Sequence, residues 1–150
     1  MSSGFSSARY FTPAGPVGLR MLAPRVLWYT GTLEDRVMKM KTREAGDVRI
    51  LEPSGRLVLG EPVDTLGKAV KAIIDEGRTK VIISLKSVDY VDSAGIGELV
   101  AAKKRAVEKK GDVKLLMPNQ TVYNVLSMLS LHLIFDIHQD EAKALRAFAA

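Results

Sequence analysis

The segment Val81–Leu85 constrains the fold of this chain most, because four of its five residues are large and apolar. A run that is apolar on both faces is typical of a central strand in a sheet that other elements cover on both sides. A helix is expected to follow from about Ser93 to Lys110, and Gly111 provides its stop. The central strand and this helix together favour a layered α/β fold.

The segments before the central strand continue the alternation of strands and helices. We expect a β-hairpin with strands at Val48–Glu52 and Arg56–Leu59 and a turn at Pro53-Ser54-Gly55. An amphipathic helix is expected to begin at Pro62, because apolar residues then recur at spacings of three and four until a glycine stop at Gly77.

The same alternation continues toward the C-terminus. The expected elements are a strand at Val113–Met117, a helix at Gln120–Leu129, a strand at Ile134–His138 and a helix at Asp140–Ala149. All segments together predict an α/β fold with a mixed β-sheet of about five strands and about four helices, mostly parallel after the opening hairpin.

Residues 1–37 differ from the rest of the chain, because they are rich in Ser, Gly and Pro and show no regular apolar period. We interpret them as a flexible N-terminal extension. Met38 and Met40 offer an alternative, in which the biological start lies at either methionine and the extension is upstream of it. In both cases we expect residues 38–150 to form the folded domain.

The composition narrows the class of protein. The chain has no cysteine, which excludes a disulfide framework, and no segment has the roughly 18 consecutive apolar residues of a membrane span. We therefore expect a cytoplasmic protein without a membrane span. The net charge is +5, but the one dense basic cluster, Lys103–Lys110, lies in an expected helix without an aromatic stacking platform. We therefore expect no direct contact with nucleic acid.

The sequence offers no credible active site, and we expect a non-enzymatic protein without cofactor or metal. His132 and His138 are six residues apart, which does not match the helical spacing of a zinc site, so we assign both a structural role. Ser93 is placed like the nucleophile of a hydrolase, between a strand and a helix. However, Val91 occupies the position where the sharp turn of a hydrolase needs glycine.

Ser93 lies at the start of an expected helix, and two interpretations of this position stay open. In the first, its hydroxyl caps free backbone N–H groups of the helix, and Asp92 complements the helix dipole. In the second, Ser93 carries a phosphate that lies over the amides of Ala94 to Gly97 at the positive end of the helix. A phosphate adds about −1.5 to −2 charge, so it would oppose a partner that binds the neutral serine.

The segment Tyr90–Gly97, YVDSAGIG, resembles the signature of the STAS domain, specifically of the anti-sigma factor antagonists. That signature is an apolar residue followed by D-S-[ST/A]-G-[LI]-G. The resemblance covers roughly residues 46 to 149, and it includes VIISLKSVDY before the motif and GDVKLLMPNQTVYNVL and LIFDIHQDEAKAL after it. It implies a small STAS-type layered fold.

The resemblance also implies the function of an anti-sigma factor antagonist. In this family the unphosphorylated antagonist binds an anti-sigma factor, which is also a serine kinase, and releases the sigma factor. Phosphorylation of the serine that corresponds to Ser93 ends this binding, and a serine phosphatase reverses it. Val58 departs from the family, since many members have an aspartate there. The residues expected to bind the partner are Asp92, Ser93, Ala94, Gly95, Ile96, Gly97 and Val58.

An alternative function is that of a STAS scaffold or accessory subunit in another signalling or transport assembly, where the same fold binds partners without a sigma factor. In either case we expect a monomer or a weak dimer.

Overall fold

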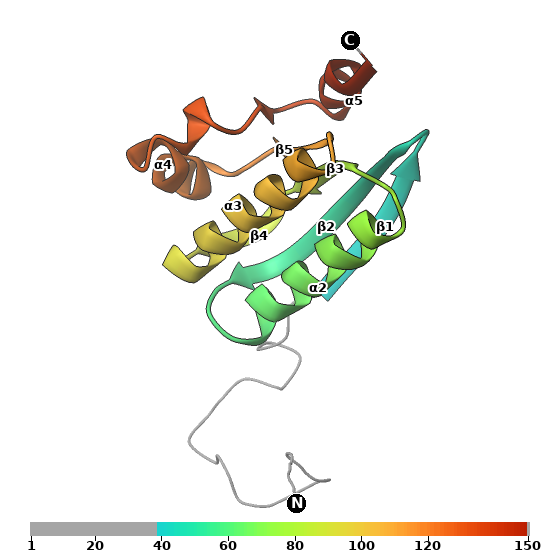
Figure 1. Cartoon of the computed structure of the whole chain (residues 1–150). Helices are drawn as coiled ribbons and strands as arrows, with labels where there is room; N and C mark the ends of the chain where they lie inside the picture. The colour runs from blue at the N-terminus through green and yellow to red at the C-terminus, as the bar shows by residue number, and fades with distance from the viewer. Residues whose placement is uncertain (1–38, 150) are drawn as a thin grey trace, which may run out of the picture. The chain divides into compact units, whose positions relative to one another are not determined.

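The computed structural model describes residues 39–149, so the expected N-terminal extension at residues 1–37 lies outside the described residues. The strands, labelled as in Figure 1, are β1 (Lys39–Ala45), β2 (Val48–Leu57), β3 (Lys80–Ser84), β4 (Ser87–Val91), β5 (Asp112–Leu116) and β6 (Ile137–His138). The helices are α2 (Glu61–Asp75), α3 (Ser93–Glu108), α4 (Gln120–Met128), the short 3₁₀ helix η1 (Leu131–Leu133) and α5 (Glu141–Ala149).

These strands form one mixed sheet. β1 and β2 are antiparallel, and β2, β3, β5 and β6 follow one another as parallel neighbours. β4 lies off this path, because it pairs in parallel with the second half of β2, beyond the residues that pair with β3. The predicted α/β fold, a mixed sheet that is parallel after its opening hairpin, is confirmed.

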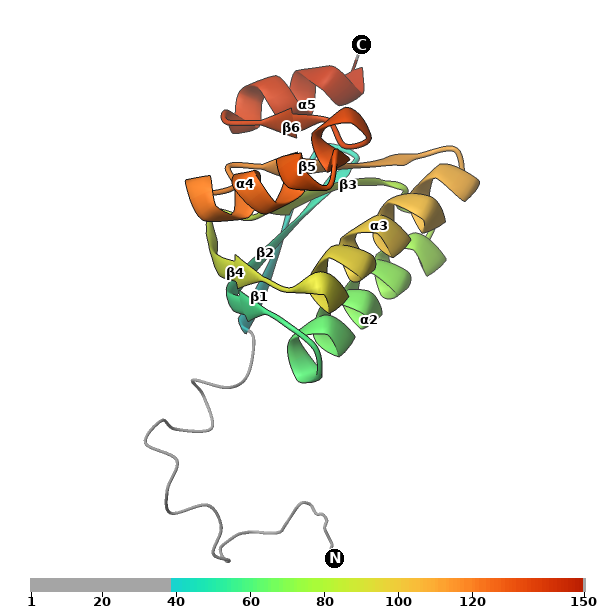
Figure 2. The ribbon, with the colours of Figure 1, turned by 90° about the vertical axis from the view of Figure 1, so that its left-hand side faces the viewer.

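The two faces of the sheet carry cores of different size. Side chains alternate along a strand, so Leu51 and Leu57 of β2 join the core under α2, α3 and α4, whereas Val48 and Ile50 face α5. α2 and α3 lie side by side on the larger core (Figures 1 and 2). α5 covers the smaller one with a single fully buried residue, Ala144.

The expected turn at Pro53-Ser54-Gly55 is wrong, because β2 runs without a break through these residues to Leu57. Pro53 lies between the part of β2 that pairs with β3 and the part that pairs with β4, an irregular position where a proline without an N–H is tolerated. Gly55 has a φ of 109°, a backbone conformation that glycine adopts at little cost, and the register with β4 shifts directly after it. The segment Pro53-Ser54-Gly55, which the sequence indicates as a turn, is therefore an irregularity within β2.

The hairpin instead joins β1 to β2 through Gly46-Asp47, and sequence analysis missed β1. Most of β1 is exposed, because it is an edge strand with a charged sequence, KMKTREA. Edge strands are commonly protected by such charges, which hide the apolar alternation that identifies a strand.

Residues 86–92, between the expected central strand and the expected helix, contain β4, which sequence analysis also missed. Val88 pairs with Gly55 and Val91 pairs with Leu57, so Asp89 and Tyr90 lie between two buried residues that are three apart. Asp89 is the extra residue of a β-bulge. The bulge interrupts the alternation of buried and exposed residues by which a strand is recognised in a sequence. The expected last strand, Ile134–His138, is also shorter than predicted, since only β6 is extended and η1 precedes it.

Candidate functional site

The residues around Ser93 lie where β2 and β4 end and α3 begins. Leu57 and Val91, the last residues of the two strands, are paired, and the amide of Asp92 donates to the carbonyl of Leu57 at 3.3 Å. The loop that follows β2 is therefore held beside the first turn of α3. This arrangement places Val58, singled out from the sequence, near the motif residues Asp92 to Gly97.

Asp92 joins the loop after β2 to the start of α3. One carboxylate oxygen, Oδ1, accepts from the amide of Gly95 at 2.8 Å and caps α3, while Oδ2 accepts from the amide of Leu59 at 3.0 Å. These N–H groups, that of Leu59 first, hold the pKa of Asp92 below its usual range because they stabilise the charged carboxylate. The prediction that the Ser93 hydroxyl caps the helix is therefore wrong, and the cap is Asp92.

Gly95 and Gly97 have different roles, although both belong to the motif. A Cβ atom on Gly95 would lie 2.2 Å from the carbonyl oxygen of Leu57, so only glycine lets α3 approach the end of β2 this closely. A Cβ atom on Gly97 would meet nothing within 4 Å. Gly95 is thus needed for packing, and Gly97 leaves open space at the surface.

The motif residues differ in how much surface they offer to a partner. Ser93 and Gly97 are exposed, Ala94 and Val58 are half-buried, and Gly95 and Ile96 are buried in the core. Leu59 is 77% exposed, although its backbone is fixed by Asp92. Sequence analysis missed Leu59, because its exposure depends on β2 ending at Leu57. We call Leu59, Ser93, Gly97 and the carboxylate of Asp92 the Ser93 surface.

The expected position of a phosphate on Ser93, over the amides of Ala94 to Gly97, is also wrong. The amide of Gly95 already donates to the side chain of Asp92, and that of Ile96 donates to the backbone carbonyl of Asp92 at 2.9 Å. A phosphate on Ser93 would therefore lie beside a carboxylate rather than over a row of free amides. Its charge would add to that of Asp92 at the surface.

Tyr90 adds an aromatic group just before this site. Its ring is 40% exposed, and the guanidinium of Arg56, which pairs with Tyr90 across β2 and β4, lies 5.1 Å from the ring centroid. A cation at this distance over an aromatic face stabilises the position of both side chains.

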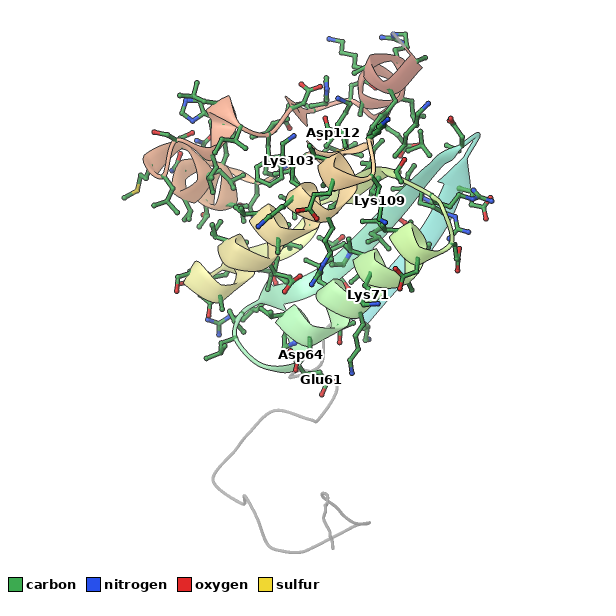
Figure 3. All side chains as sticks on the ribbon, in the orientation of Figure 1. Glu61, Asp64, Lys71, Lys103, Lys109 and Asp112 are labelled. Carbon is green, nitrogen blue, oxygen red and sulfur yellow. The ribbon has the colours of Figure 1, made fainter. Side chains whose placement is uncertain are left out.

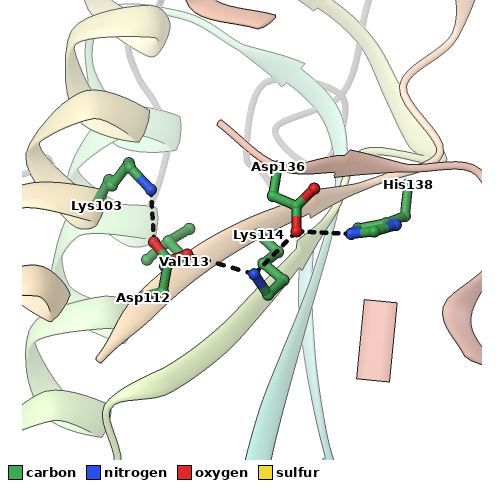
Figure 4. Close-up of polar contacts among 6 residues, drawn as sticks. All are labelled: Lys103, Asp112, Val113, Lys114, Asp136 and His138. Carbon is green, nitrogen blue, oxygen red and sulfur yellow. Dashed lines mark hydrogen bonds and ion pairs between the residues drawn. The ribbon is translucent and has the colours of Figure 1, made fainter. Parts of the chain in front are cut away.

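A second group of charged residues lies at β5 and β6, away from the motif (Figure 4). The buried amine of Lys114 is 2.9 Å from an oxygen of Asp136, and the imidazole of His138 is also 2.9 Å from that oxygen. These contacts fit the structural role assigned to His138, whereas His132 lies exposed in η1. Residues 39–149 contain no cluster of three or more histidine, aspartate or glutamate side chains arranged to hold a metal ion.

Two basic residues of α3 have acidic partners. Lys103 pairs with Asp112, and Arg105 lies 3.5 Å from Glu98. No helix in the described part of the chain combines the length and the hydropathy needed to cross a bilayer.

Comparison with known sequences relates this geometry to a family. The family model described as STAS domain matches residues 39–144. A curated relative, the anti-sigma F factor antagonist of Paenibacillus polymyxa, is 31% identical over 65 residues, which are 43% of this chain and 56% of the relative. The match thus spans little more than half the length of that relative.

Solved structures share the fold. A candidate anti-sigma factor antagonist from Thermotoga maritima is 25% identical, with a TM-score of 0.65 over 74% of this chain and 95% of that protein. A sulfate transporter family protein from Wolinella succinogenes is 20% identical, with a TM-score of 0.61 over 70% of this chain and 87% of that protein. At 20% identity, the similarity to the Wolinella succinogenes protein shows only that the two proteins share a fold.

Proposed function

The chain belongs to the STAS domain family, and on this premise we propose that it is an anti-sigma factor antagonist switched by phosphorylation of Ser93. In its unphosphorylated form it binds an anti-sigma factor that is also a serine kinase, and so frees a sigma factor. It acts as a binding protein in the cytoplasm, where sigma factors work, and a serine phosphatase restores the binding form.

The observation that carries the proposal is the exposed Ser93 on a fixed backbone. Ser93 is the first residue of α3. The residue before it, Asp92, is bound to the loop after β2 through the amide of Leu59 and to the first turn of α3 through the amide of Gly95. A kinase must bring the hydroxyl of its substrate to a defined position, and a serine held at a helix start meets this need. Gly97 leaves open space one turn further along the same helix.

The switch follows from the charge beside Ser93. Asp92 keeps its carboxylate ionised, because two amides lower its pKa. A partner that binds this surface must therefore already accommodate one negative charge. Phosphorylation adds about −1.5 to −2 more, and like charges brought together at an interface cost several kcal/mol.

Leu59 supplies the apolar contact of the same surface. Its side chain is 77% exposed, and its amide is held by the carboxylate of Asp92, next to Ser93. An exposed leucine on a fixed backbone is a suitable anchor for an apolar pocket in the anti-sigma factor. Val58, half-buried beside it, gives this loop an apolar character where many family members have an aspartate.

Isothermal titration calorimetry with a purified anti-sigma factor from the same organism tests the proposal. Ser93→Ala should bind as the wild type does, and Ser93→Asp should bind much more weakly. Ser87→Asp, which changes another exposed serine on the preceding strand, is the matched control and should bind normally. Equal binding by Ser93→Asp and the wild type would refute the switch.

A further inference from the structure

An exposed apolar surface lies at the end of α4 and on η1, and the proposed function does not use it. Its members are Met128 (83% exposed), Leu129 (55%), Leu133 (77%) and Ile134 (53%). We call these four residues the α4–η1 patch. They account for half of the large apolar side chains that are exposed in residues 39–149.

The four residues of the patch lie close together in the chain, on either side of the junction between α4 and η1. Ser130 has a φ of 59°, a left-handed conformation that is uncommon for a residue with a side chain. Its amide donates to the carbonyl of Ser127 at 2.9 Å, and its carbonyl accepts from the amide of Leu133 at 3.2 Å. Helix α4 therefore ends and η1 begins at Ser130, with two exposed apolar residues on each side.

The same region is free of charge, which the sequence shows independently of the fold. No Asp, Glu, Lys or Arg occurs between Lys114 and Asp136, although such residues make up 26% of the chain. The exposed polar neighbours of the patch, such as Asn124, Ser130 and His132, carry no permanent charge. An apolar centre within a polar rim and a lack of charged residues are typical of protein interfaces.

Other helices of the molecule present a different surface. Figure 3 shows charged side chains along α2 and α3, among them Lys71 and Lys109. Lys71 pairs with Asp75, and Arg105 pairs with Glu98. The absence of charge at α4 and η1 is thus particular to this side of the molecule.

From these observations we infer that the α4–η1 patch is a dimerisation surface that binds a second copy of this chain. In a two-fold symmetric interface, residues near the axis face their own copies. Any charge there meets a like charge, so such an interface requires an uncharged centre. A surface for a different protein has no such requirement, because opposite charges can face each other across it.

The net charge of the chain limits the strength of such a dimer. At +5, two copies repel each other over most approaches, and an uncharged surface is where this repulsion is smallest. Four side chains per copy form an interface near or below the roughly 1,200 Å² of the smallest stable complexes. The dimer is therefore weak and forms at high protein concentration.

Sedimentation velocity of the full chain, from micromolar to submillimolar concentration, tests the inference. The wild type should change from monomer to dimer over this range. Leu133→Lys and Met128→Lys should each remain monomeric, because they place like charges beside the axis. Leu59→Lys, which changes a residue of the same 77% exposure on the other surface, should dimerise as the wild type does.

Four results would overturn the inference. If the wild type is monomeric at every concentration, the patch does not bind a second copy and is instead a surface for a different protein. Dimerisation of Leu133→Lys, or its loss in Leu59→Lys, would place the contact elsewhere. A dimer that dissociates in high salt would be held by charges, whereas the α4–η1 dimer should be as strong or stronger when salt screens the net charge. Thermal melting followed by circular dichroism verifies that each variant is folded.

Discussion

The Ser93 surface and the α4–η1 patch are both exposed, but they are built in different ways. At the Ser93 surface, the carboxylate of Asp92 binds one amide of the loop after β2 and one amide of α3, and Gly95 is fixed by its contact with β2. In the α4–η1 patch, exposed side chains project from a helix end and carry no charge. In the proposed switch, phosphorylation changes the charge of the first surface, whereas the charge of the second surface stays constant. A substitution should therefore affect binding and stability differently at the two places.

The largest expected effect is that of a negative charge at Ser93. Ser93→Asp should weaken binding to the anti-sigma factor by about 100-fold, since a cost of about 3 kcal/mol for burying a second negative charge beside Asp92 in the interface corresponds to this factor. Leu133→Lys should leave the same affinity unchanged within about twofold, because the α4–η1 patch is separate from the switch. Calorimetric titration of both variants measures this difference. An equal loss of affinity in both variants would mean that the two surfaces act as one.

The next largest effect should come from Gly95. Gly95→Ala brings a Cβ atom against the carbonyl of Leu57, and we expect it to lower the free energy of unfolding by about 2–3 kcal/mol. Gly97→Ala is the matched control in the same helix. It meets no neighbour and should raise stability by about 0.5–1 kcal/mol, because alanine favours a helix over glycine. Urea unfolding measures both, and equal values would contradict the role of Gly95.

Removal of the Asp92 carboxylate should have a moderate effect that depends on pH. Asp92→Ala should cost about 1–2 kcal/mol at neutral pH, since α3 loses its cap and the amide of Leu59 loses its acceptor.

The sign of the pH dependence follows from the lowered pKa of Asp92 in the folded state. Its contribution is present above the unfolded value of about 4 and is lost as the pH falls through the folded pKa. Urea unfolding of the wild type and Asp92→Ala should therefore converge in acid. A difference that stayed constant below pH 4 would argue against the ionised cap.

The smallest effect on stability is expected in the α4–η1 patch. Leu133→Lys and Met128→Lys should change the free energy of unfolding by no more than about 0.5 kcal/mol, because both side chains are already in solvent. These measurements are made at low concentration, where the chain is monomeric. A loss above 1 kcal/mol would mean that the two residues support the fold rather than association.

Much of the fold could be predicted from the sequence, because its strongest patterns are local. The apolar run of β3 and the regular spacing of apolar residues in α2 and α3 identify these elements without tertiary information. β1 and β4 could not be found this way. Charges mask β1 at the edge, and the bulge in β4 places Val88 and Val91 on one face, against the usual period of two.

The site could be predicted in part, for a similar reason. The motif identifies Ser93, but Asp92 and Ser93 are both good helix caps, so the sequence does not decide which of them begins α3. The answer depends on the loop after β2, whose Leu59 amide binds Asp92 across 33 residues of sequence. Nothing in the sequence marks Leu59 as exposed, because a strand that continued beyond Leu57 would bury Leu59 on the same face as Leu57.

The central claim is that Ser93 is the single phosphorylated residue of a partner switch, and intact-mass spectrometry tests it most directly. The full chain is incubated with the anti-sigma factor kinase and ATP, and peptide mapping then locates the modification. We expect one phosphate per chain, on Ser93, and none on Ser93→Ala. A phosphate that persists in Ser93→Ala, or that maps to another residue such as Ser87, would contradict the account.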